Sequence, residues 1–307
     1  MCRDPEERYA AAVPPKIAPF RTVDVSDWEK LSEEPRGKRP KFWVRGAGRQ
    51  WLRKSPRATR PSEPAIEVST LALARAAGLP APDAAVCTWT EGDEVKRGIV
   101  VARFLDDAHV ESLTEGIQLL RGMDPEYNPS LHGEHTISRI RSVLAAEEAR
   151  GASRLLKSFA DVLLFDAWIG NGDRHQENWG IVIGPNAIRL APIYDTAACL
   201  GAELQPGHEL LAPARSAASL DAYIANCGSG FGQGGTDTVP MADVVAQVAR
   251  EWSEWTSSMR LLPTFKQLLE EPLTEYLATI PEEWLSVARK DFMCRVLERR
   301  LTWLGQR

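Results

Sequence analysis

The sequence is poor in cysteine and has no paired cysteine motif. Five cysteines are scattered along 307 residues, at positions 2, 87, 199, 227 and 294, and none shows the Cys-x-x-Cys spacing. An odd number of widely spaced cysteines argues against a disulfide framework and against a cysteine-based zinc cluster. We therefore expect a protein of a reducing compartment.

Long apolar runs are also missing. No stretch approaches the roughly 18–20 apolar residues of a membrane-spanning helix. The first ten residues, MCRDPEERYA, are charged and lack the apolar centre of a signal peptide. We therefore expect a cytoplasmic protein without a membrane span.

An excess of positive charge is lacking as well. The chain carries 37 basic and 42 acidic residues, a net charge of −5, which argues against a globally basic nucleic-acid-binding protein. Its hydrophobic content of 44% and charged content of 26% are ordinary for a soluble globular protein. The length allows one large domain or two modest ones.

Positive charge is nevertheless concentrated in one place. Residues 36–60 contain ten Lys or Arg and no Asp or Glu. Within this run, 41–45 and 50–54 have the pattern of two short strands, and Gly46-Ala47-Gly48 has the composition of the turn between them. The run therefore predicts a basic hairpin.

The chemistry of this hairpin is open on the sequence alone. It could cover a nucleotide, with Lys54 reaching the phosphates. It could instead bind RNA or DNA, with Trp43 and Trp51 as stacking groups. The simplest alternative is a solvated basic hairpin, because a single Gly-x-Gly is a weak signal.

A helix is predicted next, over residues 62–78, with Ser62 placed to cap its start. Glu63 and Glu67 lie one turn apart on it. In kinases, a strand lysine paired with a glutamate of the following helix orients the ATP phosphates. Alternatively, both glutamates face solvent in the first turn, where the helix dipole favours them.

A second hairpin is predicted from residues 85–90 and 95–104. Its second strand contains the apolar run 99–102, which suits an interior strand. The strand ends at Phe104 and Leu105, where we place the boundary between two lobes. Backbone groups at such a hinge are expected to bind the edge of an adenine.

The segment that organises the chain is 166–195. A strongly apolar helix, predicted over 153–169, is expected to be buried and leads through Gly-Asn-Gly to Asp173. A short hairpin, with strands at 179–183 and 187–191, then folds the chain back. The hairpin is expected to bring the residues on its two sides together.

Three polar residues of this segment suggest phosphoryl transfer. An Asp (Asp173), an Asn five residues later (Asn178) and a second Asp beyond a hairpin (Asp195) form the catalytic-loop and metal-loop arrangement of a phosphotransferase. Asp195 and Asn178 offer the hard oxygen ligands that magnesium prefers. Asp173 is then left to accept or orient the proton of an acceptor hydroxyl.

Each of these features also has a simpler explanation. The segment DRHQEN alone fits a charged, helix-capping loop, and Asp195 alone fits a turn residue after Pro192. Their combination after a buried helix and around a hairpin favours the phosphotransferase interpretation.

Weaker patterns surround this segment. Residues 1–35 predict an irregular arm that Phe20 and Trp28 dock onto the body. Residues 196–235 predict a loop with a flexible glycine-rich end at 227–235. Further helices are predicted at about 240–262, 263–279 and 282–304.

Residues 108–152 have a helical pattern interrupted by a loop at 121–134. His132 and His135 are three residues apart, a spacing that suits two metal ligands on a helix, but no third ligand is evident. A metal site is therefore a minor alternative here.

The motif residues resemble the HipA-like kinases. The segment 172–178, GDRHQEN, followed by PIYD at 192–195, is similar to the Asp-x-His-x-x-Asn and Pro-x-Tyr-Asp motifs of that family. The phosphatidylinositol kinase superfamily carries a similar Asp-Arg-His-x-x-Asn. RPKFWV at 39–44 and WLRK at 51–54 resemble the first hairpin of smaller HipA-like proteins.

The resemblance implies an α+β, bilobal protein-kinase-like fold. It implies a small mixed β-rich N-lobe at 36–107 and a larger, mainly helical C-lobe at 108–307, after an arm at 1–35. It also implies ATP- and Mg²⁺-dependent phosphorylation of Ser or Thr on a protein. The implied site comprises catalytic Asp173 and His175, nucleotide-binding Lys54, Glu67, Phe104 and Leu105, and the metal ligands Asn178 and Asp195.

The acceptor is not identified by the sequence, and a small-molecule hydroxyl is an alternative to a protein. A lipid kinase should present basic residues after the metal Asp, but residues 196–214 contain no Lys or Arg. A degenerate kinase-fold binding module built on residues 36–60 is the alternative from another class. The complete set of Asp173, Asn178 and Asp195 argues against it.

In the HipA-like family a phosphate-loop serine serves autoregulation. The Gly46-Ala47-Gly48 turn has no hydroxyl, so self-inhibition by that route is not expected.

Overall fold

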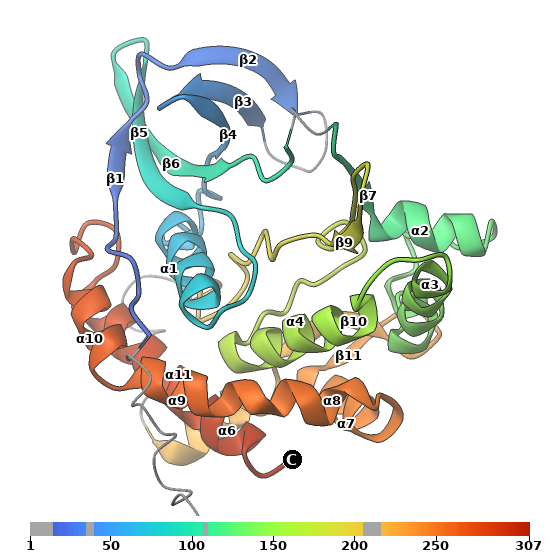
Figure 1. Cartoon of the computed structure of the whole chain (residues 1–307). Coiled ribbons are helices and arrows are strands. Elements are labelled where there is room, and N and C mark those ends of the chain that lie inside the picture. The colour runs from blue at the N-terminus through green and yellow to red at the C-terminus, as the bar shows by residue number, and fades with distance from the viewer. Residues whose placement is uncertain (1–14, 35–39, 107–109, 205–215) are drawn as a thin grey trace, which may run out of the picture.

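The computed structural model of the chain describes residues 15–34, 40–106, 110–204 and 216–307. A mixed β-sheet with one helix forms its N-terminal part, and a mainly helical region follows (Figure 1). This arrangement confirms the predicted α+β class. Residues 35–39 of the basic run lie outside the described residues.

The N-terminal sheet has the strand order β1-β5-β6-β4-β3-β2 among the described residues. Strands β1 and β5 run parallel, and the other neighbours are antiparallel. The strands are β1 (Thr22–Asp24), β2 (Glu29–Glu34), β3 (Lys41–Gly46), β4 (Arg49–Lys54), β5 (Ala84–Glu91) and β6 (Glu94–Ala102).

Strands β1 and β2 correct the prediction of an irregular arm over residues 1–35. They occupy the two edges of the sheet, and no residue of β2, EKLSEE, is buried. A charged edge strand avoids pairing with other chains but shows no hydrophobic alternation, so its sequence resembles a loop. Phe20 packs into the main core and Trp28 against the sheet, as expected. Residues 1–14 lie outside the described part.

The predicted hairpin of β3 and β4 is present, but its turn lies away from Lys54. The register pairs Lys41 with Lys54 and Gly46 with Arg49. Ala47 and Gly48, with φ of 49° and 75°, form the two-residue turn of a type that requires positive φ. Five residues of strand, roughly 17 Å, separate this turn from Lys54. It does not cover a nucleotide held by Lys54, and its lack of a hydroxyl carries no information about autoregulation.

Helix α1 (Glu63–Ala76) packs against one face of the sheet and is buried from Glu63 to Ala74. The opposite face carries a smaller apolar cluster that includes Val44, Trp51 and Val100. Trp51 is 4% exposed, and its Nε1 donates to the Gly46 carbonyl. The indole of Trp51 is therefore not accessible for stacking on a nucleic-acid base, which corrects that interpretation.

The helical region is organised around helix α4 (Leu155–Ile169), where the apolar helix was predicted. Helix α4 contacts α3, α7, α8 and α11 (Figure 1). The rings of Trp168 and Phe265 stack with centroids 4.2 Å apart. The other helices are α2 (Gly116–Met123), α3 (Ile137–Ala149), α6 (Ala217–Ala225), α7 (Met241–Glu251), α8 (Glu254–Ser258), α9 (Leu262–Leu269), α10 (Glu271–Ala278) and α11 (Val287–Leu304), with 3₁₀ turns η2 (His132–Glu134) and η4 (Met259–Leu261).

Two short sheets complete this region. One has the order β7-β8-β9, and the other pairs β10 with β11. The predicted hairpin is β8 and β9, whereas β7 was missed because its partner, β8, is distant in sequence. Helix α6 and strand β10 correct the prediction of a loop up to residue 235. The strands are β7 (Ser112–Glu115), β8 (Gly180–Ile183), β9 (Ile188–Leu190), β10 (Gly228–Gly232) and β11 (Thr238–Pro240).

Across the described ranges, every helix falls short of the length and hydrophobicity needed to cross a membrane.

Candidate active site

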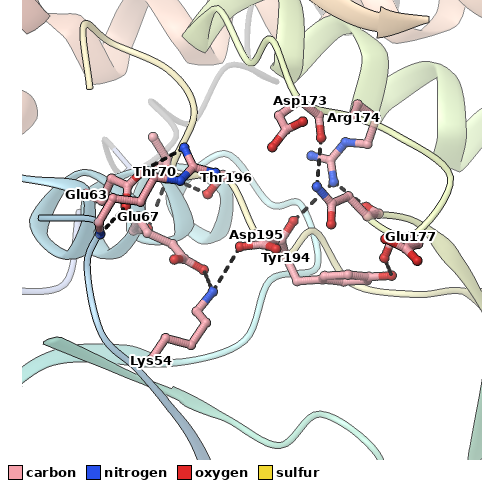
Figure 2. A network of polar contacts seen from close by, with 12 residues as sticks. Lys54, Glu63, Glu67, Thr70, Asp173, Arg174, Glu177, Tyr194, Asp195 and Thr196 are labelled. Atoms are coloured by element: carbon pink, nitrogen blue, oxygen red, sulfur yellow. Dashed lines mark hydrogen bonds and ion pairs between the residues drawn. The ribbon is translucent and has the colours of Figure 1, made fainter. Parts of the chain in front are cut away.

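Lys54 joins the sheet to the loop that follows β9. Its Nζ lies 2.5 Å from Oε1 of Glu67 on α1 and 3.0 Å from Oδ1 of Asp195 (Figure 2). Lys54 and Glu67 are 6% and 3% exposed. The three residues, predicted from separate motifs, are therefore in direct contact.

Glu63, the other candidate partner of Lys54, has a different role. Its carboxylate accepts hydrogen bonds from the backbone N–H and the guanidinium of Arg57, each at 3.1 Å. The geometry thus distinguishes the two glutamates, which lie one turn apart on α1. Neither faces solvent, because both are 3% exposed, and this removes the alternative of two solvated helix-start acids.

The charge state of Lys54 follows from its partners. Burial alone would lower the pKa of Lys54, but the carboxylates of Asp195 and Glu67 outweigh it and raise that pKa. Burial raises the pKa of Glu67, and the Lys54 ammonium opposes the rise. Lys54 is therefore a fixed cation at neutral pH, held between one carboxylate from each part of the molecule.

Asp195 is held in an unusual backbone conformation. Its φ is 55°, in the left-handed region that Asp and Asn tolerate better than most residues. On either side, Ile193 N donates to the Pro80 carbonyl at 2.8 Å, and the hydroxyls of Thr196 and Thr70 lie 2.6 Å apart. The loop of Asp195 is thus bonded to α1 and to the segment after it.

The loop of Asp173 is fixed by a buried ion pair that sequence reasoning missed. Arg174, 1% exposed, donates through Nε and Nη2 to both oxygens of Asp166, at 2.7 and 2.8 Å. Its Nη1 donates to the carbonyls of Asn178 at 2.5 Å and Tyr194 at 3.1 Å. One guanidinium therefore ties together α4, the loop of Asp173 and the loop of Asp195. A carboxylate at position 166, within the otherwise apolar run 162–169, was the available signal.

Asn178 and Asp173 are coupled through the backbone of this loop. Asn178 Nδ2 donates to the Asp173 carbonyl at 2.7 Å. Because that carbonyl only accepts, the amide orientation is fixed and Oδ1 remains as an acceptor. The Asp173 side chain is 46% exposed, so its carboxylate is accessible to a substrate. Figure 2 shows Asp195 between Lys54 on one side and the loop of Asp173 and Arg174 on the other.

His175 lies beside Asp173 without a hydrogen bond to it. Its Nε2 is 3.9 Å from Asp173 Oδ1, and its Nδ1 accepts from the Glu177 backbone N–H at 3.2 Å. With Nδ1 accepting, the ring proton of neutral His175 lies on Nε2, toward Asp173. The arrangement places a polar N–H near the carboxylate.

The predicted hinge meets the Asp195 loop through an aromatic contact. The rings of Phe104 and Tyr194 stack with centroids 5.7 Å apart, and the Tyr194 hydroxyl donates to the Glu177 carbonyl at 3.1 Å. Leu105 is half-buried beside Phe104. The segment after β6 thus contacts Tyr194, the residue before the candidate metal ligand Asp195.

The glycine-rich stretch at 227–235 packs closely against the Asp173 loop, which corrects the prediction of a flexible segment. A Cβ on Gly230 of β10 would lie 2.7 Å from the Arg174 backbone nitrogen. The Gly230 carbonyl accepts from His135 Nδ1 at 2.8 Å. The glycines therefore permit close backbone packing, a possibility that composition alone does not distinguish from flexibility.

His135 lies between this glycine-rich stretch and Trp179. Trp179 Nε1 donates to His135 Nε2 at 3.0 Å, so both ring nitrogens are bonded. Burial lowers the pKa of His135 to about 4, which keeps the ring neutral. These bonds leave no nitrogen for a metal and correct the minor alternative of a metal site with His132.

The oxygen atoms of Asp195 and Asn178 suit a magnesium ion that takes its other ligands from a nucleotide and from water. Asp195 offers a carboxylate and Asn178 an amide oxygen, both hard donors. In the described ranges, no three or more His, Cys, Asp or Glu side chains cluster so as to hold a metal. A metal here would therefore depend on phosphate oxygens and water for its remaining ligands.

One protein family matches most of the chain. A model of the HipA-like C-terminal domain family matches residues 34–255, which includes both arms of the Lys54 contact and the Asp173 loop. No curated protein matches the sequence.

Several solved structures resemble the chain. The Helicobacter pylori proinflammatory kinase CtkA does so with a TM-score of 0.71 and 19% identity, over 92% of this chain and 94% of that one. HipA of Shewanella oneidensis MR-1, solved with HipB and operator DNA, gives a TM-score of 0.49 and 16% identity, over 91% of this chain and 67% of its own. The Golgi casein kinase with Mn and ADP bound gives a TM-score of 0.36 and 11% identity, over 96% of this chain and 74% of its own. The match to CtkA shows that the fold is kinase-like.

Proposed function

The chain belongs to the family of HipA-like C-terminal domains, and we propose that it is an ATP- and Mg²⁺-dependent kinase that phosphorylates Ser or Thr on a protein. One observation carries the proposal. Lys54 joins Glu67 and Asp195 in a buried contact, next to a loop that presents an exposed Asp173. The active cleft would lie between an N-lobe at residues 36–107 and a C-lobe at 108–307.

Lys54 is the proposed phosphate ligand. Its raised pKa keeps a permanent positive charge at the cleft, and Glu67 fixes the direction of the ammonium group. Phe104 and Leu105, at the end of β6, would bind the adenine through their backbone. Asp195 accepts the second hydrogen bond from Lys54.

Asn178 and Asp195 are the proposed metal ligands. They would hold a magnesium ion, which would supply positive charge to balance that of the ATP phosphates. The Arg174 guanidinium, bonded to the carbonyls of Asn178 and Tyr194, would hold these two ligands in register. Arg174 is itself held by two hydrogen bonds to the buried Asp166 carboxylate.

Asp173 is the proposed catalytic base. The acceptor hydroxyl oxygen would form a bond to the γ-phosphorus as the bond from that phosphorus to the β,γ-bridging oxygen breaks. The hydroxyl proton would pass to the Asp173 carboxylate, and ADP would leave. His175, with an N–H toward Asp173, would orient that carboxylate or a transferred phosphate oxygen.

The acceptor class is tested with γ-³²P-labelled ATP. The protein is incubated with Mg²⁺ and, separately, a cell lysate, lipid vesicles and a mixture of small-molecule alcohols, and labelled species are identified by mass spectrometry. We expect label on Ser or Thr of protein, lost when EDTA removes Mg²⁺. Label confined to lipid or small molecules would overturn the protein-kinase assignment, and no transfer in any arm would overturn the kinase assignment.

A further inference from the structure

Arg300, near the end of helix α11, is a buried arginine that contacts the end of α4. It is 1% exposed, and its Nη1 donates to the Ala167 carbonyl at 2.9 Å. A Cβ on Gly170 would lie 2.7 Å from Arg300 Cζ, so the guanidinium is packed flat against that glycine. None of the described acidic side chains forms an ion pair with Arg300.

The end of α4 supplies the missing negative charge. The last turn of a helix has carbonyls without intrahelical partners and a partial negative charge. The last turn of α4 contains no basic residue of its own, and Gly170 ends the helix with φ of 70°. The Gly170 and Asn171 N–H groups satisfy the Asp166 carbonyl, whereas the Ala167 carbonyl is satisfied by Arg300. Arg300 is therefore the capping cation of α4, delivered from another helix.

The capped end of α4 leads directly to the loop of Asp173. Asn171 Nδ2 donates to Asp166 Oδ1 at 2.9 Å, and Asn171 Oδ1 accepts from the Asp173 N–H at 3.2 Å. A continuous path of contacts thus runs from Arg300 through Ala167 and Gly170 to Asp173. A second contact joins the two helices. Trp168 Nε1 of α4 donates to the carbonyl of Leu297, which lies one turn before Arg300 on α11, at 3.2 Å.

Stability alone does not explain an arginine at this position. Among the described residues, Arg300 Nε has no hydrogen-bond partner although it is buried. A buried cation with incomplete bonding costs stability, and an apolar side chain of similar volume is often at least as stabilising. The guanidinium is more consistent with a requirement for one precise geometry at the end of α4.

We propose that Arg300 is a positioning residue for phosphoryl transfer, which caps α4 from α11 and thereby sets the position of the Asp173 loop. The inference rests on the proposed kinase function. It concerns Asp173 first, because Asn171, the residue after Gly170, accepts from the Asp173 N–H, whereas Lys54 belongs to the sheet. Arg300 touches neither nucleotide nor acceptor in this account.

The test compares Arg300→Met and Arg300→Lys with a matched control, Arg299→Met. Arg299 is the neighbouring arginine, but it is on the surface and pairs with Asp221 at 2.5 and 2.7 Å. Mg²⁺-dependent transfer of label from γ-³²P-labelled ATP to protein acceptors of a cell lysate gives kcat and the KM for ATP, nucleotide affinity comes from titration with a fluorescent ATP analogue, and circular dichroism follows folding. All measurements are made well below the melting temperature of each variant.

We expect Arg300→Met to fold and to bind nucleotide like the wild type while kcat falls about 10- to 100-fold, the effect of a small misplacement of a catalytic group. Arg300→Lys keeps the charge but not the planar contact, so its kcat should lie between that of the wild type and that of Arg300→Met. A kcat for Arg300→Met equal to that of Arg299→Met would overturn the inference. If Arg300→Met does not fold, Arg300→Lys decides: lowered kcat with unchanged nucleotide affinity supports the inference, and unchanged kcat overturns it. Absence of turnover in the wild type would instead overturn the proposed function.

Discussion

The ammonium of Lys54 lies 3.0 Å from Oδ1 of Asp195, although 141 residues separate them in the sequence. Lys54 belongs to the sheet and Asp195 to the helical region, so one ion pair joins the two parts of the molecule at the candidate site. Glu67 completes the contact from α1. Glu67 and Asp195 therefore share one buried ammonium. Because the buried charge of Glu67 can be removed by a second substitution, the effects of Lys54 on stability and on phosphoryl transfer can be measured separately.

Lys54→Met is expected to abolish phosphoryl transfer and to destabilise the protein. Removing the lysine leaves the Glu67 carboxylate buried without its cation, which costs about 3–5 kcal/mol. Urea unfolding measures this loss. In Lys54→Met/Glu67→Gln the buried charge is gone as well, so most of the stability should return while transfer stays abolished. Recovery of transfer in the double variant would contradict a role for Lys54 in chemistry.

A lysine in a partly exposed ion pair controls for charge removal. Lys157 pairs with Asp161 at 2.5 and 2.6 Å but is 31% exposed. Lys157→Met should change the free energy of unfolding by less than about 1 kcal/mol, as for other exposed ion pairs, and leave transfer unchanged.

Asp195→Asn is expected to weaken magnesium binding in the presence of nucleotide. Asn tolerates the left-handed backbone of Asp195, whereas Ala would add about 1–2 kcal/mol of strain and confuse the result. Loss of the carboxylate should raise the Mg²⁺ concentration for half-maximal transfer by at least about tenfold. Titration of activity with Mg²⁺ at fixed ATP measures this shift, and an unchanged Mg²⁺ requirement would exclude Asp195 as a metal ligand.

Arg174→Lys is expected to be far from conservative. Lysine cannot make the two parallel bonds to Asp166 together with the bonds to two carbonyls, so buried acceptors lose hydrogen bonds at a cost of about 1–3 kcal/mol. The half-exposed pair of Arg189 with Glu111, at 3.0 and 3.1 Å, is the control. Arg189→Lys should cost less than about 1 kcal/mol. Equal unfolding free energies for the two variants would contradict this account of the Arg174 bonds.

The stability contributed by neutral His135 is expected to decrease in acid. Its folded-state pKa is lowered from 6.5 to about 4, so the unfolded state binds the proton more readily. The contribution, roughly 3 kcal/mol, is complete above the unfolded-state pKa and is lost as the pH falls from about 6.5 to about 4. The difference in unfolding free energy between the wild type and His135→Gln should therefore shrink between pH 7 and pH 4. A difference that does not vary with pH would show that His135 is not held neutral.

The sequence predicted the elements whose signals are local. The buried helix at 153–169 was recognised from its continuous apolar pattern, and the hairpin ending at Lys54 from alternation around a glycine turn. The residues of the Lys54 contact were also identified, because each lies in a short motif whose chemistry requires its side chain. Which of Glu63 and Glu67 pairs with Lys54 could not be predicted, because it depends on how α1 packs beside the end of β4.

The features missed by sequence reasoning depend on distant partners. Strand β2 is stabilised by pairing with β3 and shows no apolar alternation of its own. The glycines of β10 fit closely behind Arg174, yet a flexible linker has the same composition. Arg174, Asp166 and Arg300 are ordinary charged residues in the sequence, and their importance follows from burial, which results from tertiary packing.

The most direct test of the central claim is phosphoryl transfer by Asp173→Ala. If Asp173 is the catalytic base, transfer from γ-³²P-labelled ATP to the acceptor should fall about 100- to 10,000-fold, while Mg²⁺-nucleotide affinity stays roughly unchanged because Lys54, Asn178 and Asp195 are intact. Transfer by Asp173→Ala at the wild-type rate would contradict the catalytic assignment.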